Sequence, residues 1–298
     1  MFDVLFSEHT LTTALSLATP ILLCALGGAV CSQSGNFNIS MEAFMLIGAF
    51  FGVVGSYYLS SAAAGVLTAV LASVAMALLY GFFLIKLKAN EIILGFGFNM
   101  LAIALTGWLL EPVFGGSGSF YNPATPSLGK ITIPLIDKIP VLRCLSGHNI
   151  LVYASWVLVL VLFLLMYRTP LGFRLRALGE NPKALVSSGL RTVRYRYLAE
   201  IIIGVTCGLA GAFLSVGNLS MFTENMTSGR GYIAVAAVGF SNAYIPVTAL
   251  ASLLFGLTSS AAIQLQGVGF PSQLVDMTPY VFTIIIIIIS GLKQSRKN

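Results

Sequence analysis

Glu42 and Asn99 are polar residues inside long apolar stretches, and Asn36 and Asn38 lie in the short polar break just before Glu42. An ionised carboxylate at the middle of a bilayer costs about 2.5–3.5 kcal/mol on insertion scales. Glu42 is therefore expected to face a cavity or a partner, or to be protonated. Asn99 poses a smaller version of the same problem. Buried polar groups of this kind indicate a path for a solute or a proton.

The patterns typical of catalysis do not accompany these residues. No helical stretch carries paired carboxylates, and His9 and His148 are isolated from one another. The cysteines lack C-x-x-C spacing, which argues against a metal site or a disulfide framework. They are Cys24, Cys31, Cys144 and Cys207. The sequence also has no G-x-x-x-x-G-K-[ST] motif for ATP. We expect no catalytic residue, no metal ligand and no cofactor in this chain.

The segment 168–197 is the most polar part of the sequence and contains seven of the sixteen basic residues. These seven are Arg168, Arg174, Arg176, Lys183, Arg191, Arg194 and Arg196. Long apolar runs precede and follow the segment. Because basic loops stay on the cytoplasmic side of a membrane, this loop sets the expected orientation of the whole chain.

A short capped helix is predicted inside this loop. The Asn181 side chain can accept from backbone N–H groups of a first helical turn, and Pro182 suits the first helical position. Gly189 can end the helix in the left-handed conformation, and Glu180 lies near its positive end. A helix over 183–188 spans only roughly 10 Å, too little to cross a bilayer. The alternative is a solvated loop with one stray helical turn.

The composition places the chain among integral membrane proteins. Of 298 residues, 57% are hydrophobic and 9% are charged, and the mean hydropathy is +0.92. Soluble domains carry about 25% charged residues. The apolar runs are too long for barrel strands and do not alternate, so helices are the expected spanning elements. The net charge of +6 comes from bases beside apolar runs, which indicates membrane topology rather than nucleic-acid binding.

Nine apolar runs are separated by polar segments, and one of them, 231–240, is too short to cross alone. The longer runs are 11–31, 39–59, 62–85, 91–110, 149–167, 195–217, 247–265 and 279–292. With the loop 168–197 in the cytoplasm, the loop 111–148 is expected outside, together with the N-terminus. The basic tail residues Lys293, Arg296 and Lys297 are then inside. A re-entrant segment near Asn36 would reverse the side of the N-terminus.

Two glycine-containing breaks occupy corresponding places in the two halves of the chain. The first spans 34–38, and the second, 228–232, contains Gly229 and Gly231. Paired interruptions of this kind point to a transport site at an internal repeat, although two ordinary polar turns would look the same. The expected fold is an all-α polytopic membrane bundle of about 8–10 segments. It is expected to contain broken or re-entrant helices and an internal inverted pseudo-repeat.

Three motifs carry a resemblance to a known family. They are R-x-L-G-E-N-P-x-A from Arg176, S-G-x-x-N-x-x-x-E from Ser34 to Glu42, and G-x-G-Y-I-A-V-A from Gly229. Together they resemble the permease subunits of bacterial ABC importers of the ribose, branched-chain amino acid and nucleoside type. The resemblance is nearest to the shorter nucleoside permease, and it extends over most of the chain as one transmembrane permease domain, 1–298.

The resemblance implies roles for two sets of residues. One set forms the coupling helix region that docks on a separate ATPase: Gly179, Glu180, Asn181, Pro182, Ala184 and Gly189. The other set lines the solute path: Asn36, Asn38, Glu42, Asn99, Gly229 and Gly231. The implied partners are an ATP-binding ABC subunit that holds ATP and Mg²⁺, an extracytoplasmic substrate-binding protein and a second, non-identical permease.

The function expected from the resemblance is nucleoside import across the cytoplasmic membrane, driven by ATP hydrolysis on another chain. Import of a simple sugar such as ribose suits the same scaffold. A stand-alone ion-coupled carrier with Glu42 as its proton site is a further alternative, but the short cytoplasmic helix would then have no obvious role. A membrane enzyme would require catalytic groups that the sequence does not offer. Glu91 and Glu200 lie one to a few residues inside helix starts on the expected cytoplasmic side. They are expected to be interfacial, or paired with Lys88, Arg194 or Arg196, rather than catalytic.

Overall fold

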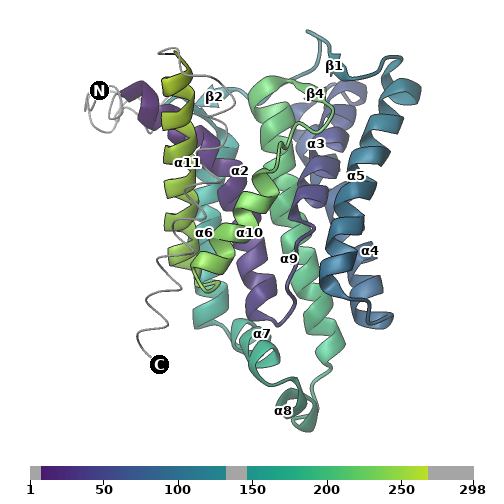
Figure 1. Ribbon diagram of the computed structural model, residues 1–298, viewed down its shortest axis with the longest axis vertical. Helices are drawn as coiled ribbons and strands as arrows, with labels where there is room; N and C mark the ends of the chain where they lie inside the picture. Colours follow the sequence, from purple (N-terminus) through teal and green to yellow (C-terminus); the bar gives the residue numbers. More distant parts are fainter. Residues whose placement is uncertain (1–7, 132–145, 268–298) are drawn as a thin grey trace.

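The structure, a computed structural model, describes residues 8–131 and 146–267 of the chain as one bundle of helices (Figure 1). The helices are α2 (Glu8–Gln33), α3 (Met41–Tyr58), α4 (Ala62–Gly81), η1 (Phe82–Lys86), α5 (Glu91–Phe114), α6 (Ile150–Arg168), α7 (Pro170–Glu180), α8 (Pro182–Ser187), α9 (Thr192–Ala212), η3 (Phe213–Leu219), α10 (Arg230–Phe240) and α11 (Ile245–Gly267). The π-helices η1 and η3 continue α4 and α9. Seven helical spans among the described residues are long and apolar enough to cross a membrane.

Short strands mark one end of the bundle. They are β1 (Ser119–Tyr121), β2 (Lys130–Ile131), β3 (His148–Asn149) and β4 (Met221–Thr223). β1 pairs with β4, and β2 pairs with β3, both antiparallel. We call the end with β1 and β4 the hairpin end. The opposite end, which carries α7 and α8, we call the basic end (Figure 1).

The helices form an inner and an outer group. The most apolar windows of α2, α3 and α9 are 83%, 78% and 78% buried, whereas those of α4, α5 and α6 are each 28% buried. Small residues allow the inner helices to approach closely. At the α3–α9 contact, a Cβ added to Gly48 would lie 3.0 Å from the Cα of Gly208. The outer helices expose leucine, isoleucine and valine side chains, as a lipid environment favours.

The chain path agrees with the expected order of spans. α2 runs from the hairpin end to the basic end, and α3 returns to the hairpin end (Figure 1). α10 has 11 residues, about 16 Å at 1.5 Å per residue, and it crosses the middle of the bundle obliquely. The expected run 279–292 and the basic tail lie outside the described residues.

Two expectations about helix boundaries were wrong. α5 continues past Leu110 to Phe114, so the loop expected from residue 111 begins with helix. It ends where Gly115 adopts φ 73° and its N–H bonds to the carbonyl of Glu111. Helix α7 was not expected at all. Its signal was present, because Thr169 accepts from the Gly172 N–H as an N-cap and Pro170 begins the helix.

Candidate functional site

The two breaks in the chain meet at Glu42, in the first turn of α3. Its Oε1 accepts hydrogen bonds from the Thr227 hydroxyl at 2.5 Å and from the Gly229 N–H at 2.8 Å. Its Oε2 accepts from the Gly231 N–H at 2.6 Å. The carboxylate thus holds the start of α10, where backbone N–H groups have no partner within the helix. We call this set of contacts the Glu42 clasp.

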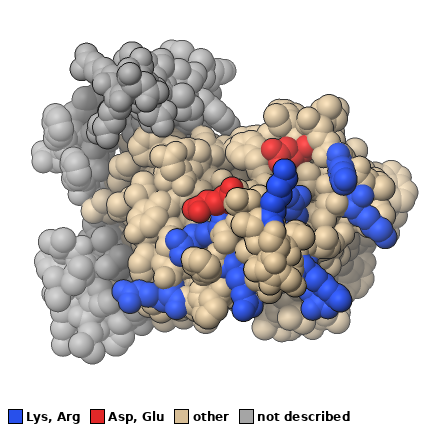
Figure 2. All heavy atoms as spheres, turned by 90° about the horizontal axis from the view of Figure 1, so that it is seen from below, with Lys and Arg blue, Asp and Glu red and all other residues tan. Residues whose placement is uncertain are grey.

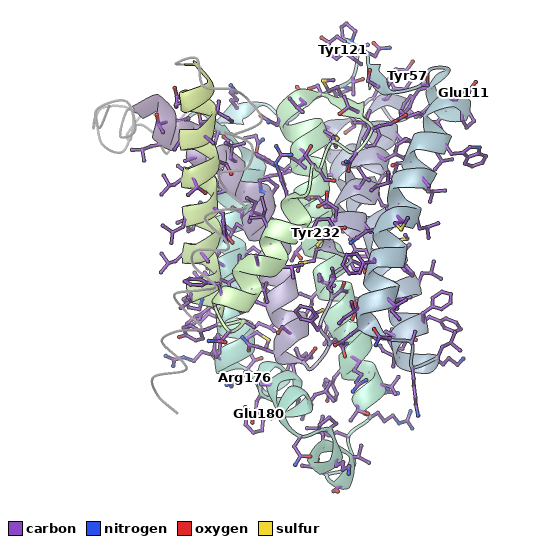
Figure 3. All side chains as sticks on the ribbon, viewed as in Figure 1. Tyr57, Glu111, Tyr121, Arg176, Glu180 and Tyr232 are labelled. Carbon is purple, nitrogen blue, oxygen red and sulfur yellow. The ribbon has the colours of Figure 1, made fainter. Side chains whose placement is uncertain are left out.

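Asn99 joins the same place from α5. Its Oδ1 accepts from the Ala43 N–H at 2.9 Å, one residue after Glu42. Its Nδ2 donates to the Ile39 carbonyl at 3.1 Å and to the Tyr232 hydroxyl at 3.0 Å. Tyr232 lies near mid-height of the bundle (Figure 3). Asn99 therefore ties the segment just after the first break, and the second break, to an outer helix at the depth where unpaired polar groups cost most.

Glu200 of α9 holds the first break from the other side. Its two carboxylate oxygens accept from the side-chain amides of Asn36 at 3.2 Å and Asn38 at 3.0 Å. The sequence led us to expect Glu200 either at the membrane interface or paired with Lys88, Arg194 or Arg196, and this was wrong. Glu200 lies eight residues inside α9 and is completely buried, because that face of α9 packs on the helical core.

The six residues expected on the solute path therefore lie in two groups, Asn36 and Asn38 on Glu200, and Asn99, Gly229 and Gly231 at or beside Glu42. Asn36, Asn38, Glu42 and Asn99 are each 2–3% exposed, and Gly229 and Gly231 contact Glu42 directly. In this conformation these polar groups bond to protein rather than line an open channel. Sequence reasoning missed Thr227, which offers no signal alone, and Tyr232, although Tyr232 is part of the G-x-G-Y-I-A-V-A motif. It misassigned Glu200, although an acid within the apolar run 195–217 was a signal.

The six residues expected to meet an ATPase lie together at the basic end. α8 has the expected caps, since Asn181 Oδ1 accepts from the Ala184 N–H at 3.2 Å and Gly189 has φ +80°. Leu185 is the buried side chain of α8, and the others are exposed. α8 projects beyond the rest of the bundle (Figure 1). It presents a short, well-defined surface to whatever binds there.

Gly179 connects this projecting surface to the first break. It lies in α7, and a Cβ added to it would overlap the Gln33 carbonyl oxygen at the end of α2. A Cβ added to Gly35 would in turn lie 3.0 Å from the Gly179 Cα. The backbones of α7 and the first break are therefore in direct contact, and any other residue at position 179 would separate them.

Charge is distributed unevenly between the two ends of the bundle. Viewed toward the basic end, many Lys and Arg side chains surround two patches of acidic side chains (Figure 2). The loop 168–197 supplies seven bases to this end, Lys86 at the end of η1 adds another, and Lys88 in the turn before α5 adds one more. The arrangement matches the excess of Lys and Arg found in cytoplasmic loops of membrane proteins.

Comparison with known proteins identifies relatives along nearly the whole chain. A family model described as "Branched-chain amino acid transport system / permease component" matches residues 10–290. A nucleoside ABC transporter permease of Lactococcus lactis is 30% identical over 283 residues, covering 91% of this chain and 88% of the relative. A guanosine ABC transporter permease of Bacillus subtilis is 31% identical over 292 residues, covering 90% and 87%.

Two further matches widen the comparison. A glucose ABC transporter permease of Haloferax volcanii is 26% identical over 311 residues, covering 99% of this chain and 80% of the relative. Among solved structures, an inward-facing ABC transporter described as metal-chelate type superposes with a TM-score of 0.56 at 15% identity. That superposition covers 96% of this chain and 87% of the other, and at this identity it shows a shared fold only.

Proposed function

This chain belongs to the family of branched-chain amino acid-type transport permeases and is the permease subunit of an ABC importer, and we propose that its solute is a nucleoside. One observation carries the proposal: relatives that transport nucleosides and guanosine align with about nine-tenths of the chain at 30% and 31% identity. A simple sugar is the second candidate, because a glucose permease aligns with 99% of the chain at 26% identity.

The basic end is proposed to face the cytoplasm and to carry the contact with the ATPase. α8 is exposed, has a defined N-cap and C-cap, and stands apart from the helical core. The proposed contact residues are Gly179, Glu180, Asn181, Pro182, Ala184 and Gly189. Within this set Gly179 is proposed to transmit movement rather than to touch the ATPase. It passes a movement of α7 to the first break through its backbone contact with Gly35.

The solute is proposed to pass the Glu42 clasp, which is closed in this conformation. Glu42 joins the start of α3 to the start of α10, and Asn99 joins both to α5. Glu200 holds Asn36 and Asn38 at the basic side of the clasp. A path can open only if the polar groups of Glu42, Asn99 and Glu200 give up these hydrogen bonds and form others. The hydrogen bonds are therefore the expected gate between the two sides of the membrane. Gly229 and Gly231 contribute backbone N–H groups to this gate.

The family implies an ATPase subunit and a substrate-binding protein as partners, and we propose further details of the assembly. ATP and Mg²⁺ are expected on the ATPase alone. A second, non-identical permease is expected beside this chain. The hairpin end, with the loop 111–148, is expected to receive the substrate-binding protein on the outer face. The chain itself is a multi-pass membrane protein, and its C-terminus is proposed to be cytoplasmic.

ATP-driven uptake by the reconstituted complex tests this function. Proteoliposomes containing the permease pair and the ATPase, supplied with the binding protein, are expected to accumulate radiolabelled guanosine only with ATP inside. Glu180→Arg is expected to abolish uptake, because it reverses the charge beside α8. If Glu180→Arg and wild-type complexes take up guanosine equally, the assignment of α8 as the coupling site is wrong. If the wild type accumulates glucose or ribose but no nucleoside, the sugar alternative holds.

A further inference from the structure

A cavity of about 270 Å³ lies between α2 and the chain segment that leads into α10. Ser16, Leu17 and Pro20 of α2 form one wall, and the end of η3 with residues 223–230 forms the other. These segments belong to the half of the bundle nearer the hairpin end (Figure 1). The cavity therefore lies on the proposed outer side of the gate. Its size is just below the roughly 300 Å³ at which small-molecule sites begin.

The cavity combines apolar surface with several polar side chains. The polar side chains are three hydroxyls, two amides, one carboxylate and one guanidinium, from Ser16, Thr223, Ser228, Asn218, Asn225, Glu224 and Arg230. Glu224 Oε1 accepts from the Gly118 N–H at 3.2 Å, and Oε2 has no hydrogen bond within the described residues. Leucine, proline, phenylalanine and methionine side chains supply the rest. A few polar groups set in an apolar wall are typical of small-ligand sites.

Part of this wall is held in a demanding backbone conformation. Asn225 and Ser228 of the wall have φ of 53° and 48°, and Gly229, which follows Ser228, has φ 79°. A non-glycine residue in this region costs of order 1–3 kcal/mol, and such residues concentrate at ligand-binding segments. The inner side of the same segment is fixed by the Glu42 clasp through Thr227 and Gly229. Contacts made in the cavity therefore act on a segment that the gate also holds.

We propose that this cavity binds the polyhydroxylated ring of the solute on the outer side of the gate. The proposal rests on the proposed function and names the part of the solute that this chain recognises. A sugar ring has apolar faces and a rim of hydroxyl groups, which match the mixed walls. The Glu224 carboxylate and the Asn218 and Asn225 amides are suited to neighbouring hydroxyls, since a carboxylate oxygen accepts and an amide both donates and accepts.

Other parts of the expected solutes fit less well. A nucleobase requires an aromatic face for stacking, and Phe213, the aromatic residue of the wall, is only 2% exposed. An amino acid requires a cation for its carboxylate. The Arg230 Nη1 already donates to the Met226 and Thr227 carbonyls at 3.1 and 3.2 Å. Recognition of the ring alone also accommodates relatives that carry nucleosides and a relative that carries glucose.

Direct binding to the permease–ATPase complex without the substrate-binding protein tests the proposal. The probes are guanosine, ribose, hypoxanthine and leucine, each measured by equilibrium binding in nanodiscs. Two variants change the cavity. Glu224→Gln keeps an oxygen for Gly118 but removes the charge, and Ser228→Gly removes a hydroxyl while easing a left-handed backbone. The matched controls are Glu111→Gln on an exposed acid and Ser60→Gly, where φ is 49°.

We expect guanosine, ribose or both to bind, with about a tenfold rise in Kd in Glu224→Gln and a smaller rise in Ser228→Gly, since hydrogen bonds to charged groups are the stronger ones. The controls are expected to bind as the wild type does. Binding of guanosine alone identifies a nucleoside as the source of the ring, and binding of ribose alone identifies a free sugar.

Binding of hypoxanthine or leucine in place of the sugar-bearing probes would overturn the proposal. So would the absence of any binding, or equal affinities in all five proteins. ATP-driven guanosine uptake by the complete wild-type system tests the nucleoside function separately. Normal uptake with unchanged binding in the cavity variants would therefore reject the cavity and leave the proposed function standing.

Discussion

Replacing Glu42 by glutamine is expected to destabilise the bundle strongly, although the two side chains have nearly the same shape. Both carboxylate oxygens accept hydrogen bonds, Oε1 from Thr227 and Gly229 and Oε2 from Gly231. A glutamine amide must turn its NH₂ group toward one of these sets of donors. If it faces Gly231, one bond is lost. If it faces Gly229 and Thr227, the Gly229 bond is lost and the hydroxyl must reorient.

The expected loss of stability is that of the less costly orientation, in which one hydrogen bond is lost. One hydrogen bond to a charged group contributes about 1.5–3 kcal/mol, and a buried N–H left without a partner costs about 1–3 kcal/mol. Glu42 is 2% exposed, so water does not replace the missing acceptor. The combined loss is about 2.5–6 kcal/mol, which at roughly 2 °C per kcal/mol lowers the melting temperature by about 5–12 °C.

Thermal melting of the purified protein in detergent measures this loss, with Glu111→Gln as the matched control on an exposed acid. Thr227→Val removes one donor of the clasp from the other side. The double variant should then be less destabilised than the sum of the single variants, since contacting residues couple by about 0.5–3 kcal/mol. If Glu42→Gln melts together with Glu111→Gln, or the two clasp variants add fully, Glu42 does not hold the start of α10.

Three further predictions concern the contacts that link the basic end to the clasp. Gly179→Ala should abolish ATP-driven uptake while ATPase binding persists, because its Cβ overlaps the Gln33 carbonyl; Gly97→Ala, which has open space around it, should take up solute normally. Glu200→Gln should lower the melting temperature by roughly 4–8 °C, because one buried amide donor loses its acceptor; an unchanged value would show that Asn36 and Asn38 are held otherwise. Asn181→Ala should weaken ATPase binding in a pull-down with little change in melting, since the lost N-cap contributes about 1 kcal/mol to an exposed helix.

Helix existence could be predicted from this sequence because both the apolar runs and the caps are local signals. Asn181, Pro182 and Gly189 specify α8 within a few residues, and the structure has the helix where they place it. Thr169 and Pro170 specify α7 by the same capping rules. That helix was missed because the high polarity of the segment 168–197 was taken to indicate a loop. The end of α5 was missed because the segment from Glu111 is polar and rich in Gly, Pro and Ser, whereas the helix continues through Pro112 to Phe114.

The partners of the buried polar residues could not be predicted in the same way. The cost of a carboxylate at membrane depth requires that Glu42 have partners, but it does not say which. Those partners, Thr227, Gly229 and Gly231, are separated from it by more than 180 residues of chain. Glu200 illustrates the converse error. Its neighbours in sequence are basic, so a local ion pair was expected, but the helix turns its side chain toward the core, where Asn36 and Asn38 meet it.

The contacts between the basic end and the Glu42 clasp follow one another from α7 through the first break to α3. Because these contacts are stiff, a movement of α7 is expected to be transmitted to the clasp. At Gly179 and Gly35 the backbones of α7 and the first break approach directly, so no flexible side chain lies between them at this point. The next residues are fixed to α9 by Glu200, and α3 begins directly after them. Packed cores change between discrete arrangements rather than deform continuously. A shift of α7 must therefore either be absorbed in the Gly179–Gly35 contact or carry the first break, and with it Glu42, to a new set of partners. Since that contact has no side chain to absorb a shift, movement of α8 by a bound ATPase is expected to reach the clasp and open it.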